Sequence, residues 1–134
     1  MMYKNHLNIS DIETYLNSIL DGKVSENTFF TTYPNTSLVL ASDWQDMVVV
    51  TIPGGIQDFD ALGSGYILMG LYARPMESGK KNVAKMSELE NKLNVVLENS
   101  ANSRFALIRN NVYANYDEDL EWHCNVVELK LLVV

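Results

Sequence analysis

Apolar side chains recur every three to four positions in two stretches of the chain, and each stretch predicts an amphipathic helix. The first helix is expected over about 11–21, where Ser10 and Glu13 have the spacing of a capping box and Gly22 suits the helix end. The second is expected over about 82–98. Its apolar stripe consists of Met86, Leu89, Leu93, Val96 and Leu97.

Strands are predicted for the stretches 28–33, 38–42, 47–52, 66–73, 105–113 and 120–134. The first three are short and separated by turn residues, which favours a meander of antiparallel strands. The fourth is almost entirely apolar, as in a strand buried on both faces at the centre of a sheet. In the last stretch apolar and polar residues alternate, which predicts a strand with one buried face that forms a hairpin with the stretch before it.

The expected element order is therefore α-β-β-β-β-α-β-β. Strands that follow one another without strict alternation with helices predict an α+β fold, with a mostly antiparallel sheet and two helices packed on one face. We expect a single domain over residues 1–134. A long glycine-bounded loop, residues 53–65, separates the third and fourth predicted strands, and loops of this length in small domains tend to be functional.

Charge and composition narrow the classes of function. A net charge of −7 argues against wrapping duplex nucleic acid, and a single cysteine argues against disulfides and cysteine-rich zinc sites. The charges are segregated, because residues 71–109 carry seven bases and four acids whereas residues 1–70 carry two bases and eight acids. No signal peptide or membrane-spanning run is evident, so we expect a protein made in a cytoplasm, without membrane association.

No catalytic, cofactor-binding or metal-binding residue is predicted. His123 and Cys124 are adjacent, but neighbours in a strand point to opposite faces, so this histidine cannot activate this thiol. The acidic stretch 117–121 lacks the donor spacing and the glycine of a calcium loop. Residues 78–81 resemble a phosphate-binding loop but miss its first glycine and its magnesium-binding hydroxyl.

The second half of the chain contains an apolar strand (66–73), a helix of about 17 residues (82–98) and a long final hairpin that ends in residues 122–131. This order of elements, together with a helix near the N-terminus, resembles the tail-completion, tail-terminator and neck-ring (head–tail connector) proteins of tailed bacteriophages. The loop 53–65 is longer than the commoner pattern in these proteins.

The resemblance implies a non-enzymatic structural protein of the virion, assembled in the cytoplasm of a bacterial host. Its subunits would form a homo-oligomeric ring, six- or twelve-fold, at the head–tail junction or the tail end. Other neck or tail proteins would be its partners. DNA would pass through an acidic lumen without specific binding, and no cofactor is implied.

Charge layout predicts the residues at the contact between copies. Acidic and basic loops leave opposite ends of the predicted strand 66–73, too far apart to neutralise each other within one subunit, so a head-to-tail neighbour would have to do so. The expected oligomer-interface residues are Asp58, Phe59, Asp60, Met76, Lys80 and Lys81.

Two other classes of function stay open from the sequence. A small ligand-binding or enzymatic α+β domain would need a pocket, for which Asp58, Asp60 and Tyr66 are the available polar groups. A protein-binding adaptor would use an open sheet edge, and the C-terminal strand is the expected edge.

Overall fold

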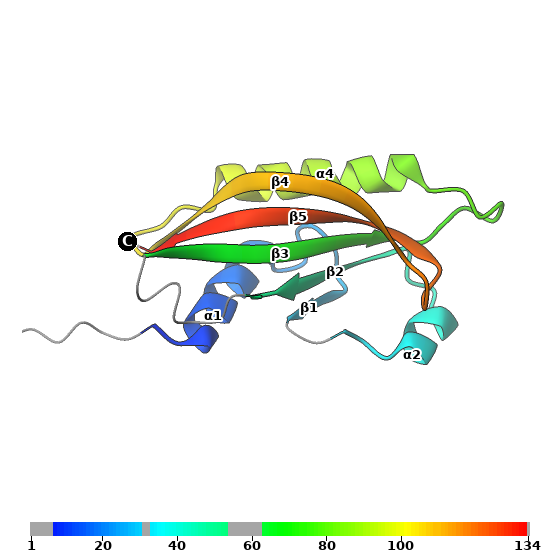
Figure 1. Cartoon of the computed structure of the whole chain (residues 1–134), viewed down its shortest axis with the longest axis horizontal. Helices are drawn as coiled ribbons and strands as arrows, with labels where there is room; N and C mark the ends of the chain where they lie inside the picture. Colours follow the sequence, from blue (N-terminus) through cyan, green and yellow to red (C-terminus); the bar gives the residue numbers. More distant parts are fainter. Residues whose placement is uncertain (1–6, 31–32, 54–62, 134) are drawn as a thin grey trace, which may run out of the picture.

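The computed structural model describes residues 7–30, 33–53 and 63–133 (Figure 1). The described elements are α1 (Ile9–Leu20), β1 (Thr28–Phe30), α2 (Thr36–Ala41), β2 (Asp46–Thr51), β3 (Ser64–Ala73), α4 (Val83–Glu98), β4 (Phe105–Asp117) and β5 (Trp122–Val133). The strands form one sheet in the order β1-β2-β3-β5-β4, in which every neighbouring pair except β1 and β2 is antiparallel. The predicted α+β class with a mostly antiparallel sheet is confirmed.

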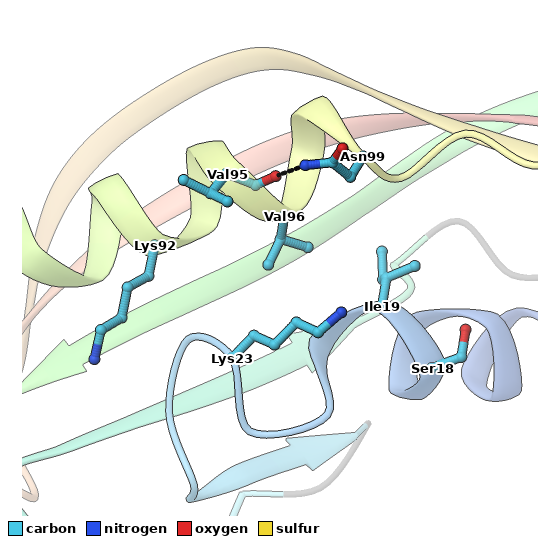
Figure 2. Close-up of a pocket in the computed structure, with 7 residues that line it drawn as sticks. All are labelled: Ser18, Ile19, Lys23, Lys92, Val95, Val96 and Asn99. Carbon is cyan, nitrogen blue, oxygen red and sulfur yellow. Dashed lines mark hydrogen bonds between the residues drawn. The ribbon is translucent and has the colours of Figure 1, made fainter.

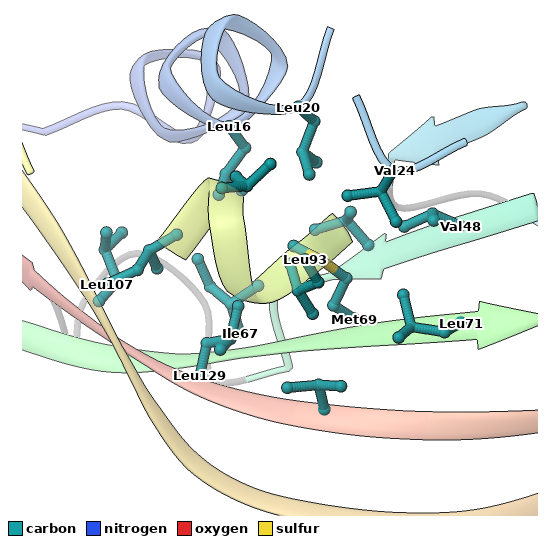
Figure 3. Packing of buried hydrophobic residues seen from close by; sticks show 14 of the residues in the cluster. Leu16, Leu20, Val24, Val48, Ile67, Met69, Leu71, Leu93, Leu107 and Leu129 are labelled. Atoms are coloured by element: carbon teal, nitrogen blue, oxygen red, sulfur yellow. The ribbon is translucent and has the colours of Figure 1, made fainter. Parts of the chain in front are cut away.

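The main core lies between the sheet and the helices α1 and α4, which pack on the same face as predicted (Figure 3). Leu16 of α1 and Leu93 of α4 meet the β3 side chains of Ile67 and Met69, and each of these four side chains is at most 2% exposed. The predicted stripe of α4 is therefore confirmed as its buried side, except that Leu97 is only partly buried.

Helix α1 begins two residues earlier than its predicted start. Asn8, not Ser10, is the N-cap, and the Asp11 carboxylate accepts a hydrogen bond from the Asn8 backbone N–H at 3.0 Å. Asp11 thus takes the role that the sequence suggested for Glu13, because the chain turns into the helix before Ser10. The expectation for Gly22 is confirmed, since it adopts the left-handed conformation with φ of 72°.

The prediction of a strand over 38–42 is wrong, because this stretch lies in helix α2. Asn35 caps the helix by accepting a hydrogen bond from the Leu38 N–H at 3.2 Å. A short apolar run has no period long enough to separate helix from strand, so the cap decides. Val39 is buried on the second face of the sheet, opposite α1 and α4, in a smaller core with Tyr72 and Trp122.

The predicted antiparallel meander is also wrong at its first step. β1 pairs parallel to β2, with Thr28 opposite Val48. Parallel neighbours need a crossover rather than a tight turn, and the chain containing α2 supplies it.

The strand order settles which strands are central. β3 lies between β2 and β5, as its apolar sequence predicts. The C-terminal strand β5 is central as well, so the prediction that it is the open edge is wrong, and β4 is the edge on that side of the sheet. In β3, a Cβ atom at Gly70 would lie 2.8 Å from the Tyr72 ring, so the close position of this ring requires glycine.

Candidate interaction site

The long edge strand β4 is the most accessible regular element of the sheet. It has 13 residues, and most positions from Ile108 to Tyr116 are exposed. Three large side chains stand out, because Ile108 is 51% exposed and Tyr113 and Tyr116 are each 45% exposed. An edge strand carries unpaired backbone N–H and C=O groups that can pair with another chain. β4 therefore combines open hydrogen-bonding groups with apolar surface.

The basic loop of the predicted oligomer contact follows β3, and the acidic loop precedes it. Met76 is 54% exposed and Lys80 is exposed. Lys81 is held within the subunit, because its ammonium group donates to the Asn125 side chain at 3.1 Å. Lys80 is thus the freer of the two lysines for contact with another copy. Asp58, Phe59 and Asp60 lie outside the described residues.

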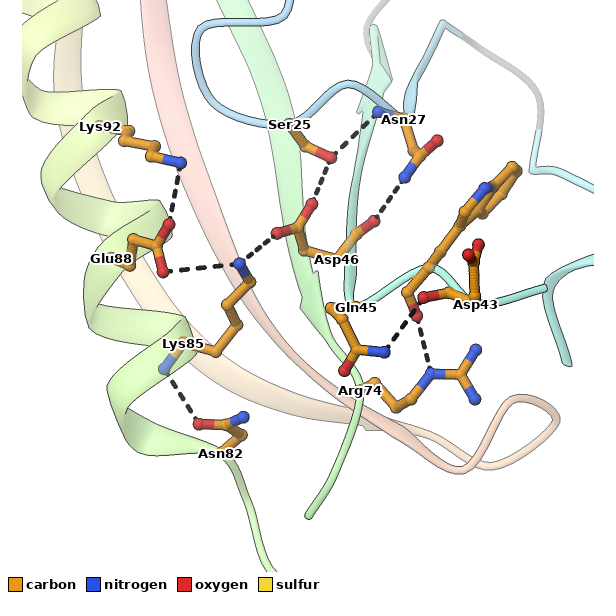
Figure 4. Close-up of polar contacts among 11 residues, drawn as sticks. Ser25, Asn27, Asp43, Gln45, Asp46, Arg74, Asn82, Lys85, Glu88 and Lys92 are labelled. Carbon is orange, nitrogen blue, oxygen red and sulfur yellow. Dashed lines mark hydrogen bonds and ion pairs between the residues drawn. The ribbon is translucent and has the colours of Figure 1, made fainter. Parts of the chain in front are cut away.

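An ionic network that sequence reasoning missed ties α4 to the start of β2 (Figure 4). The Lys85 ammonium lies 2.9 Å from one carboxylate oxygen of Asp46. The other carboxylate oxygen of Asp46 accepts a hydrogen bond from the Ser25 hydroxyl at 2.6 Å. Hydrogen bonding to Asp46 raises the pKa of Lys85 above its ordinary value. Glu88 bridges Lys85 and Lys92 along the helix. In the sequence, Lys85, Glu88 and Lys92 lie outside the apolar stripe of the helix, which indicates only that their side chains contact solvent. The pairing of Lys85 with Asp46 depends on the tertiary fold.

His123 and Cys124 lie on opposite faces of β5, as the strand geometry predicts. Cys124 is 1% exposed in the smaller core beside Tyr72, whereas the His123 ring packs edge-on against Tyr116, 5.0 Å between ring centroids. Burial is the main reason that the pKa of Cys124 is raised to about 11. The thiol and the imidazole therefore do not form a catalytic pair.

We expect Cys124 to resist thiol reagents in the folded protein. At pH 8 only about one thiol in a thousand is ionised when the pKa is near 11, and the thiolate is the reactive form. Labelling with Ellman's reagent should be complete in 6 M urea and negligible within minutes in native buffer. Rapid stoichiometric labelling of the native protein would contradict the burial of this side chain.

The turn between β4 and β5 is shorter than predicted, because β4 continues to Asp117. The Asp117 carboxylate accepts a hydrogen bond from the Leu120 backbone N–H at 2.9 Å, and Glu121 adopts a φ of 58°. These groups shape the turn into β5. Within the described ranges no cluster of His, Cys, Asp and Glu is arranged to hold a metal ion.

A groove of about 320 Å³ lies between α1 and α4 (Figure 2). Ile19, Val95 and Val96 supply its apolar surface, and Lys23 and Lys92 supply its charges. Val95 is 60% exposed, so the groove is open to solvent. Of the polar groups expected for a pocket, Tyr66 does not line this groove, because it is on β3, 47% exposed, on the face of the sheet opposite α1 and α4. Asp58 and Asp60 lie outside the described residues.

Comparisons with known proteins give no further assignment. No protein-family model matches the chain. No curated protein matches it significantly in sequence. Of the helices in the described part of the chain, none has the length and apolar character needed to cross a membrane.

Proposed function

We propose that the protein is a structural subunit that assembles with copies of itself through the open edge of its sheet. The observation that carries this proposal is β4, a 13-residue edge strand whose exposed side chains include Ile108, Tyr113 and Tyr116. Soluble proteins normally protect such edges with charges, prolines or short strands. β4 has two charged side chains, Arg109 and Asp117, and a bulge between Arg109 and Asn111, but it is long and has no lysine or proline. Pairing with another chain would satisfy its outer backbone groups.

The form of assembly that we propose is a ring of the phage tail-terminator or neck-ring kind. The order of a helix, a central strand, a second helix and a final hairpin supports it, and these elements are present in the structure. A sheet with edges on opposite sides, β1 and β4, suits head-to-tail contacts that close into a ring. Lys80 is exposed in the loop between β3 and α4 and is available to an acidic neighbour. The net charge of −7 is compatible with a lumen that does not bind DNA.

Light scattering after size exclusion, followed by electron microscopy, tests the proposal. We expect a six- or twelve-fold ring for the natural sequence. Ala114→Lys places a charge on the exposed edge and should weaken assembly about tenfold or more, because edge lysines block strand pairing. Ser87→Lys adds the same charge on the exposed side of α4 and should leave assembly unchanged.

A monomer at all concentrations would overturn the ring. A monomer that captures a separate protein through β4, in an interaction that Ala114→Lys abolishes, would identify the chain as an adaptor instead. Both variants should melt at the temperature of the natural protein, since positions 87 and 114 are exposed.

A further inference from the structure

We propose that the side of β3, β5 and β4 opposite α4 binds the same side of a second copy of the chain, related by a two-fold axis. This inference rests on the proposed self-assembly and specifies a second contact surface for it, which shares the side chains of Ile108 and Tyr113 with β4 but not the strand's backbone edge. We define the open sheet face by four rows of paired positions: Ser64, Tyr66, Leu68, Gly70, Ala106, Ile108, Asn111, Tyr113, Val126, Glu128, Lys130 and Leu132.

Strand register places these side chains on one surface. Lys130 of β5 lies between Tyr66 of β3 and Ile108 of β4. The next position on this side of β5, Glu128, lies between Leu68 and Asn111, and the one after it, Val126, lies opposite Tyr113. Directly paired residues in a sheet point to the same side, so these side chains form adjacent rows. Tyr72 and Cys124, also paired, continue the same surface into the smaller core.

Only one end of this surface is covered by described residues. There, Val39 of α2 and Leu120 pack against Tyr72 and Trp122, and Val126 at the border of the open sheet face packs against the same smaller core. The rest has no described helix over it, and in Figure 1 α4 passes behind β4. Tyr66 is 47% exposed, and Leu68, Val126 and Leu132 are half-buried.

A sheet face that contacts water normally carries polar side chains at alternate positions. Here seven of the twelve positions of the open sheet face carry aliphatic or tyrosine side chains, and the polar exceptions include Asn111 beside Glu128. Covering such a face with another apolar surface removes apolar area from water and is favourable. Two sheets can pack face to face with a separation of about 10 Å.

The charges on the open sheet face select a second copy as the occupant. Glu128 and Lys130 are two residues apart on β5, so they have opposite charges on the same side of one strand. A two-fold axis that lies midway between two facing sheets, perpendicular to β5 and level with Leu129, brings Glu128 of each copy opposite Lys130 of the other. The face is therefore complementary to itself.

The overall charge makes this neutral surface the favoured place of contact. Two copies with a net charge of −7 each repel one another, and a contact between them has to avoid further acidic surface. The open sheet face has one carboxylate and one ammonium group. Glu128 also accepts a hydrogen bond from the Asn110 side chain, which holds its carboxylate toward β4.

Charge reversal tests the two-fold contact directly. Glu128→Lys leaves two bases on the open sheet face, and Lys130→Glu leaves two acids. Each variant alone should dimerise about tenfold more weakly, or worse, because like charges then face one another. An equal mixture of the two should recover the natural affinity to within about threefold, because opposite faces then meet. The double variant Glu128→Lys/Lys130→Glu should also recover it.

Sedimentation equilibrium at several concentrations gives these affinities when every chain also carries Ala114→Lys, which weakens ring formation through β4 and leaves the open sheet face unchanged. Glu98→Lys and Lys23→Glu are the controls. The controls make the same charge changes at exposed positions outside the open sheet face and should leave dimerisation unchanged. Far-UV circular dichroism should show that every variant folds.

Each outcome bears on a defined claim. Recovery in the mixture supports the two-fold contact. Weakened single variants without recovery show that this face binds a different surface and overturn the proposal. Unchanged dimerisation in both single variants overturns it too. If β4-dependent rings still form in that case, the proposed function stands without this contact, whereas a natural protein that stays monomeric at millimolar concentration overturns both.

Discussion

Leu93→Asp is expected to abolish folding. Leu93 is 2% exposed in the middle of the buried side of α4, in the core shared with α1 and the sheet. Removing a buried leucine side chain costs about 2–5 kcal/mol, and an unpaired carboxylate at the same place adds the cost of its desolvation. The sum reaches the total stability of a typical small domain, about 5–15 kcal/mol.

Circular dichroism and thermal melting measure this effect. Asn91→Asp is the matched control, because it adds the same charge on the same helix at an exposed position. The control should melt within a few degrees of the natural protein, as surface changes are usually worth about 0.5 kcal/mol or less. A soluble Leu93→Asp protein with the natural melting temperature would show that the side chain is not part of the core.

Arg74→Ala is expected to release α2 from the sheet and to destabilise the protein by about 2–4 kcal/mol. Arg74 follows β3, and its guanidinium donates to the backbone carbonyls of Trp44 at 2.7 Å, Ser42 at 3.0 Å and Val39 at 3.3 Å. It also lies 4.9 Å from the centre of the Trp122 ring. Without it, the carbonyls at the end of α2 lose a charged donor and the smaller core loses its cover.

Urea unfolding followed by tryptophan fluorescence measures this loss, since Trp44 and Trp122 are the two tryptophans of the chain and both adjoin Arg74. Arg74→Lys should recover less than half of it, because an ammonium group cannot donate in several fixed directions as a planar guanidinium does. Lys80→Ala removes an exposed cation and should leave the unfolding midpoint unchanged. Full recovery by lysine would mean that charge alone, without the directed hydrogen bonds, holds α2.

Much of the interaction surface depends on partners that are distant in sequence. The alternation in 127–133 identified a strand, but its position between β3 and β4 comes from long-range pairing, and so the open edge was assigned to the wrong strand. Ile108 and Tyr113 lie in a stretch for which the sequence predicted a strand but not which side chains are exposed. They are exposed because α1 and α4 cover the opposite face and α2 covers only one end of this one.

The elements with a long, regular pattern could be predicted from the amino-acid sequence. The period of the apolar residues predicted α1 and α4 and the buried side of α4, the unbroken apolar run predicted β3, and the final alternation predicted the hairpin. The helix over residues 36–41 and the parallel pairing of β1 with β2 became evident only in the folded chain. The same is true of the ion pair between Lys85 and Asp46 and of the position of β4 at the edge of the sheet. The physical reason is the range of the interactions: a helix stripe is encoded within a few turns, whereas strand order and ion pairs between elements are set by the packing of the whole chain.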